Sequence, residues 1–234
     1  MSVDLIPTET TPKSIAIVRN EDTNNNVVHV ESHTYRTVIV HILAHFNPRL
    51  AAFHMPVSSL SMLNPGVRAP LEVSAIVFNA QRDKVLLLQR VHAPNAWELP
   101  SCGIMDGEKT ALHAVVRTVH QCSGQIAQSI TRTIGFYEYE SYPPLPPCRR
   151  YCFVVEVDHP EEEEVALWLE LYQSFAWVTE DEVNEERHGG SALRFHSHAL
   201  RWIIQKAFRA VREERQGETS DEEKDTTGHS QSSA

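Results

Sequence analysis

The sequence of 234 residues is poor in several features that define classes of protein. Its four cysteines imply no disulfide framework, so we expect a reducing, cytoplasmic setting. The longest apolar runs, at 37–46 and 85–88, are too short or too interrupted by histidine to span a bilayer, and no membrane association is expected. The N-terminus lacks a basic region followed by an apolar core, so no secretory signal is predicted.

Positive charge is also scarce. The chain has 21 lysine and arginine residues against 31 aspartate and glutamate residues, which gives a net charge of −10 at pH 7. Part of the excess lies in the glutamates at 161–164 and in the C-terminal tail, which we interpret as solvated segments. Because nucleic acids are bound through basic surface that displaces counterions, nucleic acid is not expected as a partner.

The remaining composition predicts one domain with extensions. The hydrophobic content of 41% is enough for one sizeable core. Residues 1–13 are polar and 212–234 contain almost nothing apolar, so we predict a disordered N-terminus and a disordered acidic tail. Residues 14–62 contain runs rich in β-branched side chains and form an N-terminal extension to which the sequence assigns no role. The working domain is predicted at 63–211.

Within that domain, the apolar pattern is clearest from residue 71 onward. The runs at 71–79 and 84–90, separated by a polar turn, predict two strands of a hairpin. After a loop, a helix is predicted between an N-cap at Thr110 and a stop at Gly124. Its buried stripe has the spacing i, i+3, i+4 and i+7 and consists of Leu112, Val115, Val116 and Val119.

The second half of the domain is predicted to be mostly strand. Segments at 129–141, 149–158 and 165–171 are strand-like, and a second amphipathic helix is predicted over 195–213. One face of that helix carries Leu200, Ile203, Ala207 and Val211. The expected fold class is therefore mixed α/β (α+β), mostly sheet, with at least two helices.

Several separated segments resemble the Nudix hydrolase family. They are a strand ending in LLLQR, the WELP loop at 97–100, a glycine-containing turn and the helix TALHAVVRTVHQCSG at 110–124. This helix and FAWVTEDEV at 175–183 are most similar to Nudix proteins of filamentous fungi. The resemblance covers about residues 71–208. It implies one mixed sheet packed between helices.

The resemblance also implies a metal-binding box, but the acids of that box are missing. In the family, glutamates of the pattern G-x5-E-x7-R-E-U-x-E-E-x-G-U, where U is bulky and aliphatic, bind magnesium or manganese and activate water to cleave a nucleoside diphosphate linked to another group. The frame of the pattern survives here at Gly103, Arg117, Val119 and Gly124. The four glutamate positions hold Lys109, Thr118, Gln121 and Cys122.

Carboxylates that could replace the missing acids lie in the loop before the helix. Asp106, Glu108 and Glu98 are the candidates for a weakened Mg²⁺ or Mn²⁺ site. Glu108 lies one residue before the family's first glutamate, so a slip of the loop would restore that carboxylate alone. Because no helix carboxylate is restored, tight catalytic binding of a divalent metal is not expected.

Other candidate site residues lie around this loop and helix. Glu108, Asp106 and His113 are the candidate catalytic groups, and an imidazole can exchange protons near neutral pH. The candidates for substrate binding are Arg117, Gln121, Trp97 and Lys109. For Arg117, a structural ion pair with Asp106 or Glu108 is favoured over a phosphate clamp. The thiols of Cys102 and Cys122 admit a nucleophile or a zinc site, although packing as small buried groups is the default.

Three functions fit these residues, each with a small-molecule substrate or ligand. The first is a Nudix-type hydrolase of a diphosphate-containing substrate with a weakened metal site. The second is a metal-independent acid/base enzyme acting on a less charged molecule, such as a secondary-metabolite intermediate. The third is a catalytically inactive module that binds a ligand or a protein. The family resemblance favours the first, whereas the wholesale replacement of the box acids favours the third.

Overall fold

The computed structural model describes residues 16–18, 48–62, 71–93, 96–105, 107–139, 147–158 and 165–227. Predicted features outside these ranges are the tail end at 228–234, the N-terminus at 1–13, the glutamates at 161–164 and Asp106. Among the described residues, no helix is long and apolar enough to cross a membrane.

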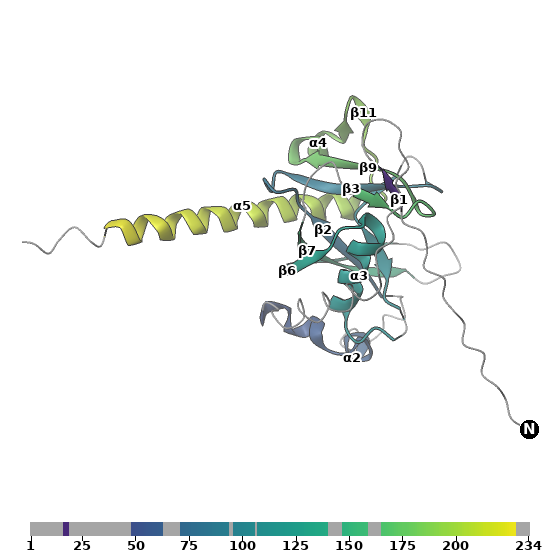
Figure 1. Ribbon diagram of the computed structural model, residues 1–234, viewed down its shortest axis with the longest axis horizontal. Coiled ribbons are helices and arrows are strands. Elements are labelled where there is room, and N and C mark those ends of the chain that lie inside the picture. Colours follow the sequence, from purple (N-terminus) through teal and green to yellow (C-terminus); the bar gives the residue numbers. More distant parts are fainter. Residues whose placement is uncertain are drawn as a thin grey trace, which may run out of the picture.

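Two main sheets form the centre of the domain (Figure 1). The larger sheet has the strand order β5 (Ser101–Gly103), β2 (Leu71–Val77), β7 (Cys148–Val157) and β6 (Ala127–Tyr139). The smaller sheet has the order β4 (Trp97–Glu98), β3 (Lys84–Arg90) and β9 (Tyr172–Thr179). Strands β2 and β7 run parallel and the other pairs of these two sheets are antiparallel, so the larger sheet is mixed.

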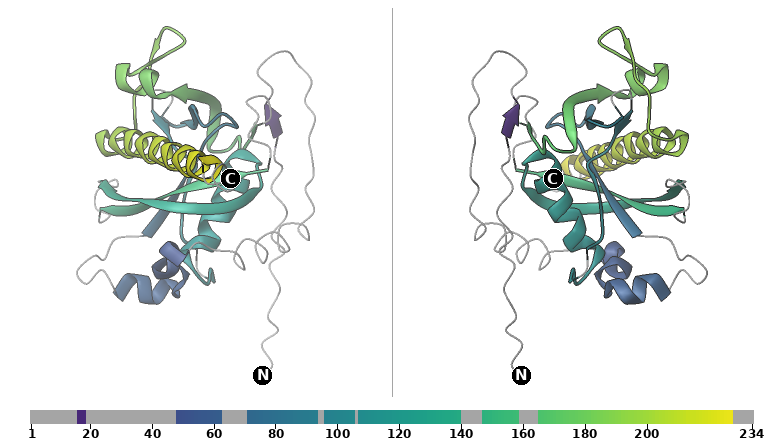
Figure 2. Two further views of the ribbon diagram at one scale, coloured as in Figure 1. Left: turned by 90° about the vertical axis from the view of Figure 1, so that its left-hand side faces the viewer. Right: turned by 90° about the vertical axis from the view of Figure 1, so that its right-hand side faces the viewer.

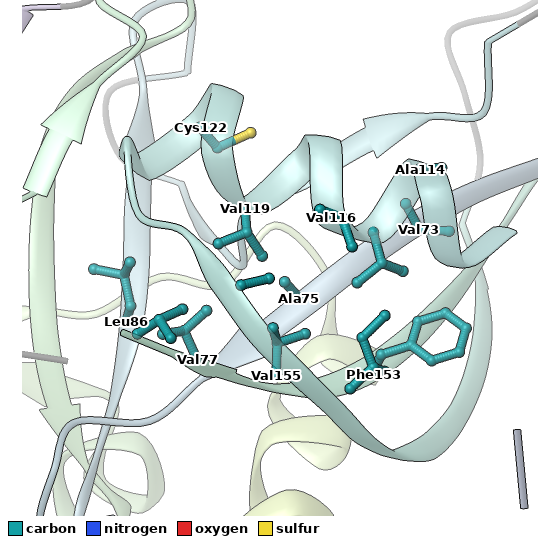
Figure 3. Packing of buried hydrophobic residues seen from close by; sticks show 14 of the residues in the cluster. Val73, Ala75, Val77, Leu86, Ala114, Val116, Val119, Cys122, Phe153 and Val155 are labelled. Carbon is teal, nitrogen blue, oxygen red and sulfur yellow. The ribbon is translucent and has the colours of Figure 1, made fainter. Parts of the chain in front are cut away.

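The two faces of the sheets are covered by different helices. Successive side chains of a strand point to opposite faces. Accordingly, Val73, Ala75 and Val77 of β2 pack in one core cluster with α3 (Ala111–Ser123), as Figure 3 shows. Ile76 of the same strand packs in a second cluster with α5 (His198–Thr227). Figure 2 shows the two helices on either side of the larger sheet, which confirms the predicted mixed sheet packed between helices.

Part of the N-terminal extension completes the core. A 3-10 helix, η1 (Pro48–His54), and a short helix, α2 (Val57–Met62), follow one another beside the larger sheet. Leu50 and Leu60 are buried, and the ring of Phe53 contacts Tyr151 and Phe153 edge-on at 5.4 and 4.9 Å between centroids. A strand further upstream, β1 (Ala16–Val18), pairs antiparallel with β8 (Val165–Leu167). Residues 19–47 of the extension, which hold most of its runs rich in β-branched side chains, lie outside the described residues.

The hairpin predicted at 71–90 is wrong in its pairing, although both strands exist. β2 and β3 belong to different sheets, and their pairing is limited to the bridge between Phe78 and Val85 beside the turn. The side chain of Asn79 holds the turn by accepting hydrogen bonds from the backbone of Asp83 and Lys84, each at 3.0 Å. From Val73 to Val77 every residue of β2 is buried, and the strand lies inside the larger sheet between β5 and β7, whereas β3 pairs with β4 and β9.

The C-terminal helix is longer than predicted. It starts close to the predicted position and buries Leu200, Ile203, Ala207 and Val211, as expected. It continues to Thr227, however, and so includes much of the segment at 212–234 that the composition indicates to be disordered. Figure 1 shows this end of α5 projecting beyond the sheets. Upstream, α4 (Glu180–Glu185) begins with a capping box between Thr179 and Glu182, which explains the acids after FAWV as a helix N-terminus. Two short strands, β10 (Arg187–His188) and β11 (Ser191–Ala192), follow it.

A buried arginine joins the two main sheets. Arg150 of β7 is 1% exposed, and its guanidinium lies 2.6 Å from a Glu72 oxygen on β2 and 3.3 Å from a Glu98 oxygen on β4. It also donates to the hydroxyls of Tyr137 and Tyr139 at 3.2 and 2.9 Å. Burial opposes the charge of Arg150, but the surrounding phenols and carboxylates outweigh it and raise the pKa well above its usual value.

Removing this guanidinium should destabilise the protein strongly. Arg150→Met would leave the buried carboxylate of Glu98 without one of its cationic partners, and we expect the free energy of unfolding in urea to fall by about 3–5 kcal/mol. The adjacent Arg149 pairs with the exposed Glu138 at 2.5 Å, so Arg149→Met is the matched control and should cost about 1 kcal/mol or less. Equal losses in the two variants would contradict a bridging role for Arg150.

The turn after α3 requires a glycine for two reasons. Gly124 has φ of 70°, and a Cβ built on it would lie 2.5 Å from the Cβ of Ala166. We expect Gly124→Ala to lower the free energy of unfolding by about 2 kcal/mol or more. Gly103→Ala is the control, because a Cβ there meets nothing within 4 Å, and the loss should stay below about 0.5 kcal/mol. Urea unfolding with similar midpoints for both variants would refute this explanation.

Candidate functional site

The helix α3 has the ends that its sequence predicts. The hydroxyl of Thr110 accepts a hydrogen bond from the backbone N–H of His113 at 3.4 Å. At the other end, Gly124 adopts a left-handed conformation and its N–H donates to the carbonyl of His120 at 2.9 Å. The apolar stripe faces the sheet, with Val116 and Val119 pointing toward β2 in Figure 3. The frame of the box is therefore intact.

The opposite face of α3 is largely buried as well. The side chains of Ala114, Thr118 and Cys122 are fully buried. Only Arg117 and Gln121 of this face are partly exposed. Two of the three helix positions that hold glutamate in the family are therefore closed to solvent.

Arg117 is the centre of the loop before the helix. Its Nε donates to Glu108 Oε1 at 2.7 Å and one terminal nitrogen to Glu108 Oε2 at 3.2 Å. The same terminal nitrogen donates to the carbonyl of Gly103 at 2.7 Å, and the other one to the amide oxygen of Gln121 at 2.7 Å. Burial opposes the charge of Arg117, but the hydrogen bonds and charge of Glu108 prevail and raise the pKa. The favoured structural ion pair is thus present.

Both carboxylate oxygens of Glu108 accept hydrogen bonds. Besides both contacts with Arg117, its Oε2 accepts a hydrogen bond from the backbone N–H of Met105 at 2.6 Å. The ion pair is well shielded, with 11% of the Arg117 side chain and 13% of the Glu108 side chain exposed. Lys109, which occupies the family's glutamate position, is exposed to solvent. The carboxylate that the predicted one-residue slip of the loop would supply is that of Glu108, and it is already paired with Arg117.

Glu98 belongs to a different group of contacts. It is fully buried, with Oε1 2.5 Å from Arg90 Nε and Oε2 3.3 Å from Arg150. The hydroxyl of Tyr172 donates to Glu98 Oε1 at 3.2 Å. Burial raises the pKa of Tyr172 well above its usual value, so the phenol remains a donor. Glu98 thus forms polar contacts that join the two sheets.

The carboxylates do not form a site that fits a divalent metal. Magnesium and manganese prefer several oxygen ligands arranged around one point. Within the described part of the chain, no three side chains among histidine, cysteine, aspartate and glutamate lie close enough to hold an ion. Glu108 and Glu98 are instead paired with separate arginines. The described carboxylates, Glu108 and Glu98, therefore do not converge on one metal ion, and Asp106, the third predicted ligand, lies outside the described residues.

Two other predicted site residues have structural contacts. His113 lies with Nδ1 2.8 Å from the hydroxyl of Thr110, and burial together with the charge of Lys109 lowers the pKa of the imidazole. Trp97 is partly buried and packs against the second core cluster, on the α5 side. Trp177 is buried in the first cluster. Trp97 and Arg117 therefore lie on different sides of the sheets and do not line one common pocket.

The thiol of Cys122, at one of the family's glutamate positions, contacts the thiol of Cys102. Sγ of Cys102 on β5 lies 3.7 Å from Sγ of Cys122 on α3, and the two are not joined in a disulfide. Cys122 also approaches the hydroxyl of Tyr172 at 3.8 Å. The sequence suggests a nucleophile, a zinc site or simple packing for this pair, but it does not predict that the two thiols touch, because they are far apart in the chain.

Sequence reasoning also missed the polar groups around Arg150 and a cavity beside α5. The signal for the first is an arginine within the apolar strand RRYCFVVEV. The second is a cavity of about 270 Å³ between α5 and the larger sheet, lined in part by Phe78, Asn79, Arg82, Glu156 and Glu214. None of the predicted site residues lines it.

Comparison with known proteins identifies the family. The model of the NUDIX domain matches residues 68–199, more than half of the chain. A NUDIX hydrolase from Nitrosomonas europaea has 16% identity and a TM-score of 0.49, with 61% of this chain and 90% of that chain covered. A C. elegans Ap4A hydrolase has 16% identity and a TM-score of 0.46, with 61% and 98% covered. An E. coli dihydroneopterin triphosphate pyrophosphohydrolase has 18% identity and a TM-score of 0.43, with 58% and 93% covered.

No curated protein sequence matches the chain significantly. The family match includes the WELP loop, the box frame and the FAWV segment, and the mixed sheet between two helices is the fold that the resemblance implies. On the strength of the match over residues 68–199, the chain belongs to the NUDIX domain family.

Proposed function

We propose that this Nudix-family chain binds a diphosphate-containing small molecule and does not hydrolyse it with a divalent metal. The observation that carries the proposal is that neutral side chains occupy the three helix positions of the box glutamates, with Thr118 and Cys122 fully buried, while Glu108 is paired with Arg117. The class of ligand follows from the family, whose members act on nucleoside diphosphates linked to other groups. A binding module is therefore favoured over a hydrolase with a weakened site.

Recruiting Glu108 to a metal would be unfavourable in two ways. The carboxylate would have to leave Arg117 and the backbone N–H of Met105. The guanidinium, held at 11% side-chain exposure, would then place a positive charge beside the metal ion. Carboxylates offset the cost of dehydrating Mg²⁺, and this loop would offer one only by breaking its own ion pair. Asp106, outside the described residues, would supply at most one further carboxylate.

The helix face does not compensate for this. Thr118 and Cys122 are fully buried and neutral side chains occupy all three positions. Thiols prefer softer metals than Mg²⁺, and the amide oxygen of Gln121 accepts a hydrogen bond from Arg117 at 2.7 Å. A divalent metal ion at this face of α3 would therefore find no carboxylate among Thr118, Gln121 and Cys122 to balance its positive charge.

Metal-independent acid/base catalysis is supported less well. A catalytic base must be free to reach a proton of the substrate. His113 is mostly neutral at pH 7 because its pKa is lowered, but one ring nitrogen lies against the Thr110 hydroxyl at 2.8 Å. Glu108 is held by Arg117. We therefore assign both residues to the loop and helix cap.

The proposal predicts binding without turnover. The purified protein should be incubated with a panel of nucleoside diphosphate derivatives and prenyl diphosphates, with and without Mn²⁺. We expect at least one compound to raise the melting temperature, because ligands that bind only the folded state stabilise it. Mass spectrometry should detect no product beyond that of a protein-free control. Multiple turnovers in the presence of Mn²⁺ would overturn the proposal, and an unchanged melting temperature across the panel would overturn its binding half.

Restoring the acids should restore metal binding. We expect the variant Thr118→Glu/Gln121→Glu/Cys122→Glu to be stabilised by Mn²⁺ relative to EDTA, by about 2–3 kcal/mol at a metal concentration near one hundred times Kd. The matched control is Thr118→Gln/Cys122→Gln, which has similar side-chain sizes at all three positions without the charges. Thermal unfolding should show no Mn²⁺ effect for the control or for the natural sequence. A clear stabilisation of the natural sequence by Mn²⁺ would show that its own donors suffice.

A further inference from the structure

The thiols of Cys102 and Cys122 differ sharply in their surroundings. Cys102 lies on β5 and is partly exposed, whereas Cys122 lies near the end of α3 and is fully buried. Their sulfur atoms are 3.7 Å apart, which is contact between two unbonded thiols. A disulfide bond is shorter, at about 2.05 Å, so a modest approach of β5 and α3 would permit one.

Cys102 has the environment of a nucleophile. The hydrogen bond from Cys122 is the strongest influence, and together with the positive charge of Arg117 it lowers the pKa of the Cys102 thiol to about 7, against the opposing effect of burial. The thiolate is the reactive form of cysteine, so the contact with Cys122 and the charge of Arg117 favour the reactive form of Cys102. In Cys122, the hydrogen bond with Cys102 and burial raise the pKa well above its usual value, so this thiol stays protonated.

The other two cysteines provide a contrast within the same protein. Cys148 and Cys152 are both buried on β7. Burial raises the pKa of Cys152 to about 12, which leaves almost no thiolate at neutral pH. Simple packing of small thiols explains Cys152 well. It does not explain why Cys102 is partly exposed and lies beside a guanidinium.

We propose that Cys102 and Cys122 form a peroxide-reactive dithiol site, in which Cys102 attacks a hydroperoxide and Cys122 resolves the product as a disulfide. The site requires no metal and is independent of the ligand that the chain binds. Cys102 lies close enough to Arg117 for the two charges to interact, so oxidation of the thiols would change the electrostatic surroundings of the Arg117–Glu108 pair.

The chemistry balances in two steps. In the first, the Cys102 thiolate attacks the terminal oxygen of a hydroperoxide, the O–O bond breaks, and the leaving alkoxide takes a proton from water to become an alcohol. Cys102 is then a sulfenic acid. In the second, the Cys122 sulfur attacks the Cys102 sulfur, the S–O bond breaks, and the Cys122 proton leaves with the hydroxyl as water. Two thiols are oxidised by two electrons, and one hydroperoxide is reduced to an alcohol and water.

The disulfide would connect β5 directly to α3. Arg117 would lose the negative charge of Cys102 but keep Glu108, Gly103 and Gln121 as partners. Cys122 would shift its sulfur relative to the Tyr172 hydroxyl, which now lies 3.8 Å away. Because Tyr172 also contacts Glu98 at 3.2 Å, the change would reach the junction of the two sheets.

The test uses the full-length, reduced protein and hydrogen peroxide at pH 7. Samples are taken over time, free thiols are blocked by alkylation after unfolding, and peptides are quantified by mass spectrometry. We expect an intramolecular Cys102–Cys122 peptide, formed on the order of tenfold faster than any oxidation of Cys148 or Cys152. Oxidation of all four thiols at similar rates, or Cys102 left reduced while Cys148 or Cys152 reacts, would overturn the proposal.

Two variants separate the roles of the thiols. Cys122→Ser should stop at a Cys102 sulfenic acid that dimedone traps, and Cys102→Ser should leave Cys122 reduced. Should either variant fold poorly, the rate of iodoacetamide alkylation at Cys102 in the natural sequence tests the activation of Cys102, and the Cys102–Cys122 peptide tests the role of Cys122. That rate should rise with pH through a midpoint near 7, whereas a midpoint above about 8.5, the value of an ordinary thiol, would contradict the proposed activation.

Discussion

The buried guanidinium of Arg150 is the constraint on which the arrangement of the two sheets depends. Removing a charge from water costs several kcal/mol unless it is paired, as an order of magnitude. Arg150 finds carboxylates in both sheets, Glu72 on β2 and Glu98 on β4. Burial raises the pKa of Tyr137 and Tyr139 above their usual values, so these phenols keep their protons. The network is satisfied only when the sheets meet at this place.

From this junction the contacts continue to the box helix. Glu98 begins the segment that leads through β5 to Gly103, and the carbonyl of Gly103 accepts a hydrogen bond from Arg117 at 2.7 Å. Tyr172 connects the same two regions from the other side, since its hydroxyl contacts Glu98 at 3.2 Å and Cys122 at 3.8 Å. The position of the loop before α3 is thus fixed at both ends by polar contacts. The described carboxylate of this loop, that of Glu108, therefore meets the helix in an ion pair with Arg117.

Local signals predicted local structure well, and long-range contacts were where sequence reasoning failed. Thr110 and Gly124 fixed the ends of α3 because capping involves only nearby backbone groups. The hairpin prediction failed because an apolar run such as β2 does not reveal which strands will flank it. An ion pair of Arg117 with Asp106 or Glu108 was foreseeable, since both acids lie near it in the sequence, and Glu108 forms it. The partners of Arg150 and the contact between Cys102 and Cys122 were not, because they come from strands and a helix distant in the sequence.

The loss of the box acids also changes how α3 can pack. A glutamate at position 118 or 122 would need water or a metal ion to balance its charge, because an unpaired carboxylate is very costly to bury. Threonine and cysteine carry no charge at neutral pH in these positions, and both are fully buried. Neutral side chains therefore permit the helix face to close against β5 and Tyr172. The contacts that stabilise this closed face use the same positions that a metal would require, so in this chain close packing and metal binding are physical alternatives.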